Sequence, residues 1–366
     1  MAGMERQHGT SILDDPDAMA RADPAGMLGL VASLPDQVEE AWRISRAVTL
    51  PWATPRAVAV LGMGGSAIGG DLVKGIWSDR IRVPLEVIRG YDLPAWVDRD
   101  TLVIASSKSG ATEETISTLS AALERRCPVT VVTTGGPLKD VAVRAGLPLA
   151  TFPAHGTPRS SVGYSMGILA GILERAGVLE LDESEIRAGA AAARDMAGRC
   201  QPGVPTADNP AKQLAWSLLD RMAIVTASGF LAPVARRWKT QLNENGKTTA
   251  TFDELPEATH NTVVGFEQPE SLRDHLYVVF LQGELDHARN VRRAELITDL
   301  LRSANIAHQV IRISADGRLG QALAVVTMGD YVSVYVAFGY ALDPSPVTVI
   351  DHIKERLAQA DEADRR

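Results

Sequence analysis

The stretch from Ala57 to Ala67 reads Ala-Val-Ala-Val-Leu-Gly-Met-Gly-Gly-Ser-Ala, an apolar run that ends in a glycine-rich turn. A second stretch has the same form: residues 101–105 are apolar or β-branched and run into Ser106-Ser-Lys-Ser-Gly-Ala-Thr112. A helical pattern follows each turn. Short apolar runs that alternate with helices are typical of a parallel sheet covered by helices on both faces. We therefore predict a doubly wound α/β fold.

The same alternation returns in the second half of the chain. Residues 199–210 contain three prolines and no apolar periodicity, which is typical of a linker. Apolar runs then recur over residues 223–227, 276–281 and 308–313. A chain of 366 residues is long enough for about two domains. We expect a helical segment over residues 1–50, a first domain over 51–200 and a second, similar domain over 201–366.

Composition excludes several classes of protein. With 37 basic and 45 acidic residues, the net charge of −8 provides no general attraction for nucleic acid or anionic lipid. The two cysteines, Cys127 and Cys200, are too few for a disulfide framework or a structural zinc site. Residues 1–10 show no leader pattern, and the apolar stretches fall short of about 18 residues. We expect a cytoplasmic protein without nucleic-acid or membrane partners.

The first glycine-rich turn also fits the loose fingerprint of a dinucleotide-binding turn. That fingerprint needs an acidic residue at the end of the next strand, whereas the next apolar run, residues 83–88, is followed by Arg89-Gly90. A tight turn that only needs glycine is the other alternative. The nicotinamide interpretation is therefore weak.

The second turn favours a smaller anion. Ser107, Ser109 and Thr112 place three hydroxyls where a strand meets a helix, so hydroxyls, backbone N–H groups and the helix dipole can converge on one anion. Helix capping is the alternative for such residues. Together with Gly65 and Ser66 of the first turn, they predict a site for a monophosphate.

These turns carry a resemblance to a known family. Gly62-Met-Gly-Gly-Ser-Ala-Ile-Gly-Gly-Asp71 and Ser107-Lys-Ser-Gly-Ala-Thr-Glu-Glu-Thr115 resemble the phosphate-binding segments of sugar isomerase (SIS) domains. The first is especially similar to the bifunctional phosphoglucose/phosphomannose isomerase family. The resemblance continues through Thr157-Pro-Arg159, Asn243-Glu-Asn-Gly-Lys247, His260-Asn261 and Asp343-Pro-Ser-Pro346, and so covers about residues 58–357.

The resemblance implies two SIS-type domains and an isomerase that needs no metal or cofactor. The expected reaction interconverts glucose 6-phosphate, mannose 6-phosphate or both with fructose 6-phosphate through an enediolate. It also implies a homodimer in which His260 reaches the site across the interface. Glu257 and His260 have the spacing of a metal-binding pair, but this spacing alone does not supply a full ligand set, and we expect no metal site.

This chemistry needs an acid or base for ring opening, a carboxylate base for the proton between C1 and C2, and a cation for the enediolate. We assign these roles to His260, Glu244 and Arg159 respectively. The alternatives are a solvated charge at a helix end for Glu244, a surface or capping role for His260 and an exposed loop charge for Arg159. Lys354 joins the site by resemblance alone, since its position beside the apolar side of a predicted helix is that of an ordinary surface lysine.

The chain departs from the family pattern at three positions. Lys108 and Ala111 stand where the second turn commonly has tyrosine and asparagine, and Ser345 stands where threonine is usual. These changes raise the alternative of a non-catalytic SIS regulator that binds a sugar phosphate without turning it over. Retention of the predicted base, acid and cation favours the enzyme.

Overall fold

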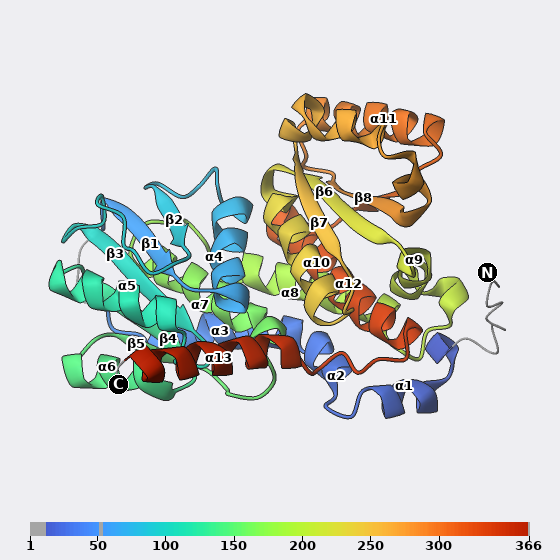
Figure 1. Ribbon diagram of the computed structural model, residues 1–366. Coiled ribbons are helices and arrows are strands. Elements are labelled where there is room, and N and C mark those ends of the chain that lie inside the picture. Colours follow the sequence, from blue (N-terminus) through green and yellow to red (C-terminus); the bar gives the residue numbers. More distant parts are fainter. Residues whose placement is uncertain (1–11, 51–53, 365–366) are drawn as a thin grey trace.

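The computed structural model describes residues 12–50 and 54–364, and shows two α/β halves that pack against each other (Figure 1). Residues 1–10, where a leader was sought, lie outside the described part. Within residues 12–50, a short 3-10 turn, η1 (Ile12–Asp14), is followed by α1 (Pro16–Ala22), α2 (Met27–Ala32) and α3 (Leu34–Ala47).

The first half contains a parallel sheet of five strands in the order β2-β1-β3-β4-β5. These strands are β1 (Ala57–Leu61), β2 (Leu85–Ile88), β3 (Thr101–Ser107), β4 (Val129–Thr133) and β5 (Leu149–Thr151). Every residue of β1, β3 and β4 is buried, which explains their unbroken apolar sequence. The helices of this half are α4 (Gly64–Ile76), α5 (Glu113–Glu124), α6 (Gly136–Ala145), α7 (Val162–Arg175) and α8 (Glu183–Cys200).

The second half contains a parallel sheet of four strands in the order β7-β6-β8-β9. Its strands are β6 (Met222–Ser228), β7 (Ala250–Leu255), β8 (Leu276–Gly283) and β9 (Ala307–Ile313). Its helices are α9 (Pro210–Leu218), α10 (Ala232–Glu244), α11 (Ala288–Ser303), α12 (Gly317–Gly339) and α13 (Thr348–Asp364). Two parallel sheets flanked by helices confirm the predicted fold class.

Side chains that alternate along β8 divide the second core into two layers. Val278 and Phe280 pack beneath α11, whereas Val279 and Leu281 face the opposite side of the sheet. That opposite side belongs to one large core, which continues through α12, α8 and α7 to β1 in the first sheet. The two halves therefore share a core instead of being joined by a flexible linker.

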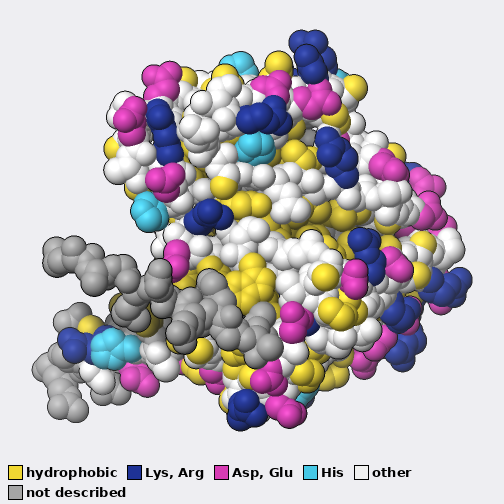
Figure 2. Space-filling view, turned by 90° about the vertical axis from the view of Figure 1, so that its right-hand side faces the viewer, with side chains coloured by type: hydrophobic (Ala, Val, Ile, Leu, Met, Phe, Trp, Pro, Cys, Tyr) yellow, Lys and Arg dark blue, Asp and Glu magenta, His cyan; other side chains and the backbone are white. Residues whose placement is uncertain are grey.

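Helix α12 is longer than the apolar stretches suggested. It has 23 residues and is long and apolar enough to cross a membrane, but 94% of its most apolar 18-residue stretch is buried inside the protein. It therefore has the surroundings of a core helix, packed on α8, α9 and α10. On the face drawn in Figure 2, acidic and basic side chains are interspersed and form no continuous patch of one sign.

Candidate active site

The first turn joins the end of β1 to α4. A Cβ atom added at Gly65 would lie 2.4 Å from the carbonyl oxygen of Pro158, so only glycine allows the segment before Arg159 to come this close. The next residue, Ser66, is buried, and its Oγ accepts a hydrogen bond from the Lys108 backbone N–H at 3.3 Å. The two phosphate-type turns are thus in direct contact.

The second turn joins β3 to α5 and gathers the three predicted hydroxyls. Ser107 Oγ lies 2.8 Å from Thr112 Oγ1 and 3.4 Å from Ser109 Oγ. Thr112 is the N-cap residue of α5, yet its side chain makes no capping hydrogen bond. Gly110 has φ = +65°, and an added Cβ atom would clash with the Gly135 carbonyl, so this turn also requires glycine.

Arg159 lies in the 3-10 turn η2 (Pro158–Ser160), is 3% exposed, and directs its guanidinium into the second half of the chain. Its Nε donates to Asn245 Oδ1 at 2.5 Å. Its Nη2 donates to the carbonyl oxygens of Pro344 at 2.9 Å and Ser345 at 2.6 Å. Burial lowers the pKa of Arg159, an effect that the charge of Glu244 partly opposes.

A buried hydrogen-bond network supports the backbone of Arg159 and its partner Asn245. The guanidinium of Arg237, on α10, donates to the Arg159 carbonyl oxygen at 3.0 Å and to Asp330 Oδ2 at 2.5 Å. Asp330, on α12, also accepts from Gln241 at 2.9 Å. The Asn245 amide donates to Ser333 Oγ at 3.0 Å, which closes the network on α12. Asn245 lies within a motif quoted from the sequence but was given no role there, and sequence reasoning did not single out Arg237, Asp330, Gln241 or Ser333.

Glu244 is the last residue of α10, and its side chain is 28% exposed. Its Oε2 lies 3.6 Å from Arg159 Nη1, so a carboxylate from the second half faces a cation from the first. Glu244 also lines an open groove of about 580 Å³ between the end of α10 and the start of α13. A small polar ligand has access to the carboxylate there.

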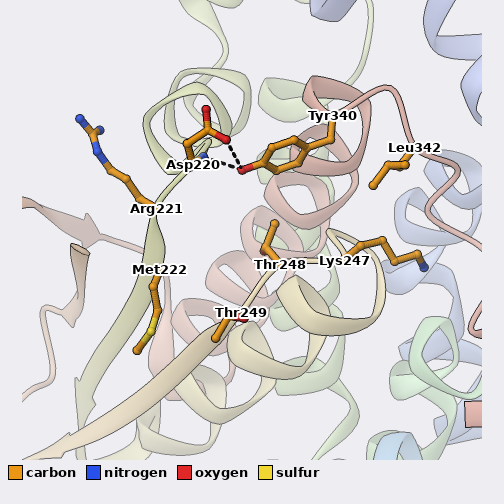
Figure 3. Close-up of a pocket in the computed structure, with 8 residues that line it drawn as sticks. All are labelled: Asp220, Arg221, Met222, Lys247, Thr248, Thr249, Tyr340 and Leu342. Atoms are coloured by element: carbon orange, nitrogen blue, oxygen red, sulfur yellow. Dashed lines mark hydrogen bonds between the residues drawn. The ribbon is translucent and has the colours of Figure 1, made fainter. Parts of the chain in front are cut away.

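Lys247 braces the other side of Glu244. Its Nζ donates to the carbonyl oxygens of Glu244 at 2.5 Å, Pro344 at 3.0 Å and Pro346 at 2.5 Å. Lys247 lines both the open groove beside Glu244 and the neighbouring pocket of about 430 Å³ drawn in Figure 3, where Tyr340 contacts Asp220. Burial lowers the pKa of Lys247, and the nearby charge of Arg159 adds to the shift. The sequence motif contained Lys247 but gave it no role.

His260 and Lys354 are not brought to this cluster within the chain. His260 is exposed in a 3-10 turn, η5 (Glu257–His260), after β7, and Lys354 is exposed on α13. In the described residues, no hydrogen bond or ion pair joins either of them to Arg159 or Glu244. Several large apolar residues of α13 are exposed: Val349, Ile350, Ile353 and Leu357. Within residues 12–50 and 54–364, no cluster of three or more His, Cys, Asp or Glu side chains could hold a metal ion.

Most of the chain matches known proteins in sequence. It is 36% identical to the bifunctional phosphoglucose/phosphomannose isomerase of Caldicellulosiruptor bescii over 336 residues, which cover 91% of this chain and 99% of that protein. The chain belongs to the bifunctional phosphoglucose/phosphomannose isomerase family. The member of this family from Aquifex aeolicus is 32% identical over 82% of this chain and 90% of its own length.

The chain is also similar to one domain family and to a solved structure. The family model described as the bacterial phospho-glucose isomerase C-terminal SIS domain matches residues 207–357. In structure, the chain resembles a hypothetical protein from Thermus thermophilus with a TM-score of 0.74, at 19% identity, over 95% of both chains. At that identity the structural likeness supports the fold, whereas membership rests on the sequence matches.

Proposed function

We propose that this member of the phosphoglucose/phosphomannose isomerase family interconverts glucose 6-phosphate and mannose 6-phosphate with fructose 6-phosphate. The observation that carries the proposal is the contact between Arg159 Nη1 and Glu244 Oε2 at 3.6 Å. This contact joins a carboxylate to a cation, and the segment that carries the cation packs against Gly65 in the first of the two turns suited to a phosphate. We also propose that the chain consists of a helical segment over residues 1–50, a first SIS domain over 51–200 and a second SIS domain over 201–366.

The roles of the residues follow from the chemistry of the reaction. The hydroxyls of Ser66, Ser107, Ser109 and Thr112, with the backbone at Gly65, hold the substrate phosphate at the start of α4 and α5. This anchor fixes the sugar, so that C1 and C2 meet the same side chain in every turnover.

Glu244 removes the proton from one carbon and returns it to the other. Its exposure to the groove leaves room for a sugar next to the carboxylate. Arg159 stabilises the negative charge that develops on oxygen in the enediolate, because a buried guanidinium interacts strongly with charge in a low-dielectric site. Since the acid–base steps and the charge stabilisation are all supplied by side chains, we expect no requirement for a metal.

We further propose a cytoplasmic homodimer whose partner subunit completes the site. Two features of the chain support this assembly. His260 is exposed and, in the described residues, makes no hydrogen bond or ion pair with Arg159 or Glu244. Helix α13 carries exposed apolar side chains together with Lys354. In the dimer, His260 opens the sugar ring in the partner's site and Lys354 completes the set of cationic groups. Dilution below the dimer dissociation constant should then reduce specific activity.

Glu244→Gln tests the chemistry directly. The amide keeps the shape but cannot accept the proton, and a positioned base supplies about 10²- to 10⁴-fold of rate. We expect kcat to fall at least about a hundredfold, with little change in the affinity for fructose 6-phosphate. Glu295→Gln, which alters an exposed ion pair on α11, is the matched control and should retain full activity. A loss under about threefold in Glu244→Gln would remove Glu244 from the mechanism.

A proton NMR time course with each hexose 6-phosphate in D₂O tests the reaction as a whole. Isomerisation through an enediolate should exchange the C2 proton for deuterium and show which epimers are substrates. Binding of fructose 6-phosphate without any isomerisation would instead support the non-catalytic regulator. Addition of EDTA should leave the rate unchanged.

A further inference from the structure

We propose that Lys108 is a positioning residue that joins the phosphate turn to the segment carrying Arg159. The inference rests on the proposed function, because it assigns a role to a side chain within that same site. Lys108 is one of the departures from the family pattern, and the structure places it at the junction of four loops.

The contacts of Lys108 reach all of these loops. Its Nζ donates to the carbonyl oxygens of His155 at 2.8 Å and Gly156 at 2.5 Å, in the segment between β5 and η2. Its backbone N–H donates to Ser66 Oγ, in the turn after β1. Its carbonyl oxygen accepts from the Thr134 hydroxyl at 2.8 Å, in the turn after β4. Movement at residue 108 therefore changes the phosphate turns and the Arg159 segment together.

The segment that carries Arg159, residues 157–160, is rigid enough to transmit a movement of Lys108 to the guanidinium. Thr157 and Ser160 form a reciprocal capping box around η2, so residues 157–160 move as a unit. Arg159 lies within that unit, and its guanidinium is already bound to Asn245. The carbonyl groups of His155 and Gly156, which Lys108 binds, immediately precede residues 157–160 and so fix the position of that turn.

A lysine suits this place because an ammonium carries three N–H donors and no acceptor. The side chain is 6% exposed, and in the part of the chain that the structure describes no carboxylate pairs with it. Burial lowers the pKa of Lys108 to about 8. A substrate phosphate at the neighbouring hydroxyls supplies the missing negative charge, so binding should favour the charged amine.

The pH dependence follows from these signs. Above about pH 8 the free enzyme loses the ammonium, so kcat/KM should fall while kcat, measured with phosphate bound, stays level. The other titratable group on the facing loop is the imidazole of His155, whose side chain is exposed. His155→Asn keeps the backbone carbonyl and removes the imidazole, so it is the control for that group.

The experiment compares wild type with Lys108→Met, Lys108→Arg and His155→Asn. We expect Lys108→Met to lower kcat/KM at pH 7 by at least about tenfold and to abolish the alkaline fall, because it loses hydrogen bonds from a charged donor. Lys108→Arg should recover part of the loss and shift the fall out of range, since arginine stays charged. His155→Asn should keep the wild-type profile.

An alkaline fall that persists in Lys108→Met, or a kcat/KM equal to that of wild type, would overturn the assignment. If Lys108→Met fails to fold, as judged by circular dichroism, the profile of Lys108→Arg decides instead: an alkaline fall unchanged from wild type overturns the assignment. Calorimetric titration with inorganic phosphate separates the two proposals. A wild type that does not isomerise refutes the proposed function, whereas equal phosphate affinity in wild type and folded variants at pH 7 refutes the role of Lys108.

Discussion

Replacement of Asp330 by asparagine tests the buried network beneath Arg159. The side chains of Arg237 and Asp330 are 1% and 5% exposed, and the two groups are 2.5 Å apart. Burial raises the pKa of Asp330, although the charge of Arg237 opposes the shift. Asparagine retains one acceptor oxygen but removes the charge, and so leaves a buried guanidinium uncompensated.

The expected cost follows from that geometry. Removing one partner of a buried ion pair costs about 3–5 kcal/mol, because the remaining charge stays desolvated. We expect Asp330→Asn to lower the free energy of unfolding by about 3 kcal/mol, the lower end of this range, since one hydrogen bond to the amide oxygen survives. The matched control is Glu295→Gln, at an exposed pair on α11, which should change stability by less than about 0.5 kcal/mol.

Urea unfolding followed by tryptophan fluorescence and by far-UV circular dichroism measures both variants. Coincident transitions are required before midpoints are converted to free energies, since a chain of this length need not unfold in two states. The double variant Arg237→Met/Asp330→Asn completes a thermodynamic cycle, and should be more stable than the sum of the single losses by at least about 1 kcal/mol. A loss in Asp330→Asn as small as that of the control would refute the argument.

Three further predictions concern the phosphate site and the thiols. Ser107→Ala should weaken the binding of inorganic phosphate about tenfold or more, because a hydrogen bond to a charged group is worth about 1.5–3 kcal/mol; an unchanged calorimetric Kd would exclude Ser107 from the site. Gly65→Ala should lower kcat/KM at least about tenfold, because the new Cβ atom would lie 2.4 Å from the Pro158 carbonyl oxygen and push the Arg159 segment away. Gly198→Ala adds a Cβ atom that meets no atom within 4 Å and should leave kcat/KM unchanged; equal activities of the two variants would show that the close approach at Gly65 is unimportant. Burial raises the pKa of Cys127 and takes that of Cys200 to about 12, so neither thiol should react with Ellman's reagent at pH 8 until urea is added; rapid labelling of native protein would contradict their burial.

The first sheet was predictable because the runs over residues 57–61 and 101–105, which are apolar or β-branched, are buried on both faces. The glycine-rich and hydroxyl-rich sequences also marked the two turns, but the contacts that require Gly65 and Gly110, to Pro158 and Gly135, are remote in sequence. The second sheet was harder. Strand β7 escaped prediction because only its ends, Ala250 and Leu255, are buried, so its sequence lacks a continuous apolar run.

The support around the predicted base and cation could not be read from the sequence. Arg237 and Asp330 are 93 positions apart and meet only because α10 packs on α12. Lys247 acts on backbone carbonyls, which leave no trace in the choice of side chains at residues 344 and 346. The two predicted phosphate-binding turns follow the carboxyl ends of strands in the first half, whereas Glu244 ends a helix that leads back to the start of β7, at the opposite end of the strands in the second sheet.

The anchoring of Arg159 limits how this protein could have evolved or be recombined. The residue belongs by sequence to the first half, yet the acceptors of its guanidinium hydrogen bonds, at Asn245, Pro344 and Ser345, all belong to the second. A chimera that joins the first half to the second half of a distant relative would keep the arginine and lose its orientation. The two halves are therefore a single unit of inheritance, and substitutions near residues 245 and 344–345 should be accepted only when the geometry around Arg159 is preserved.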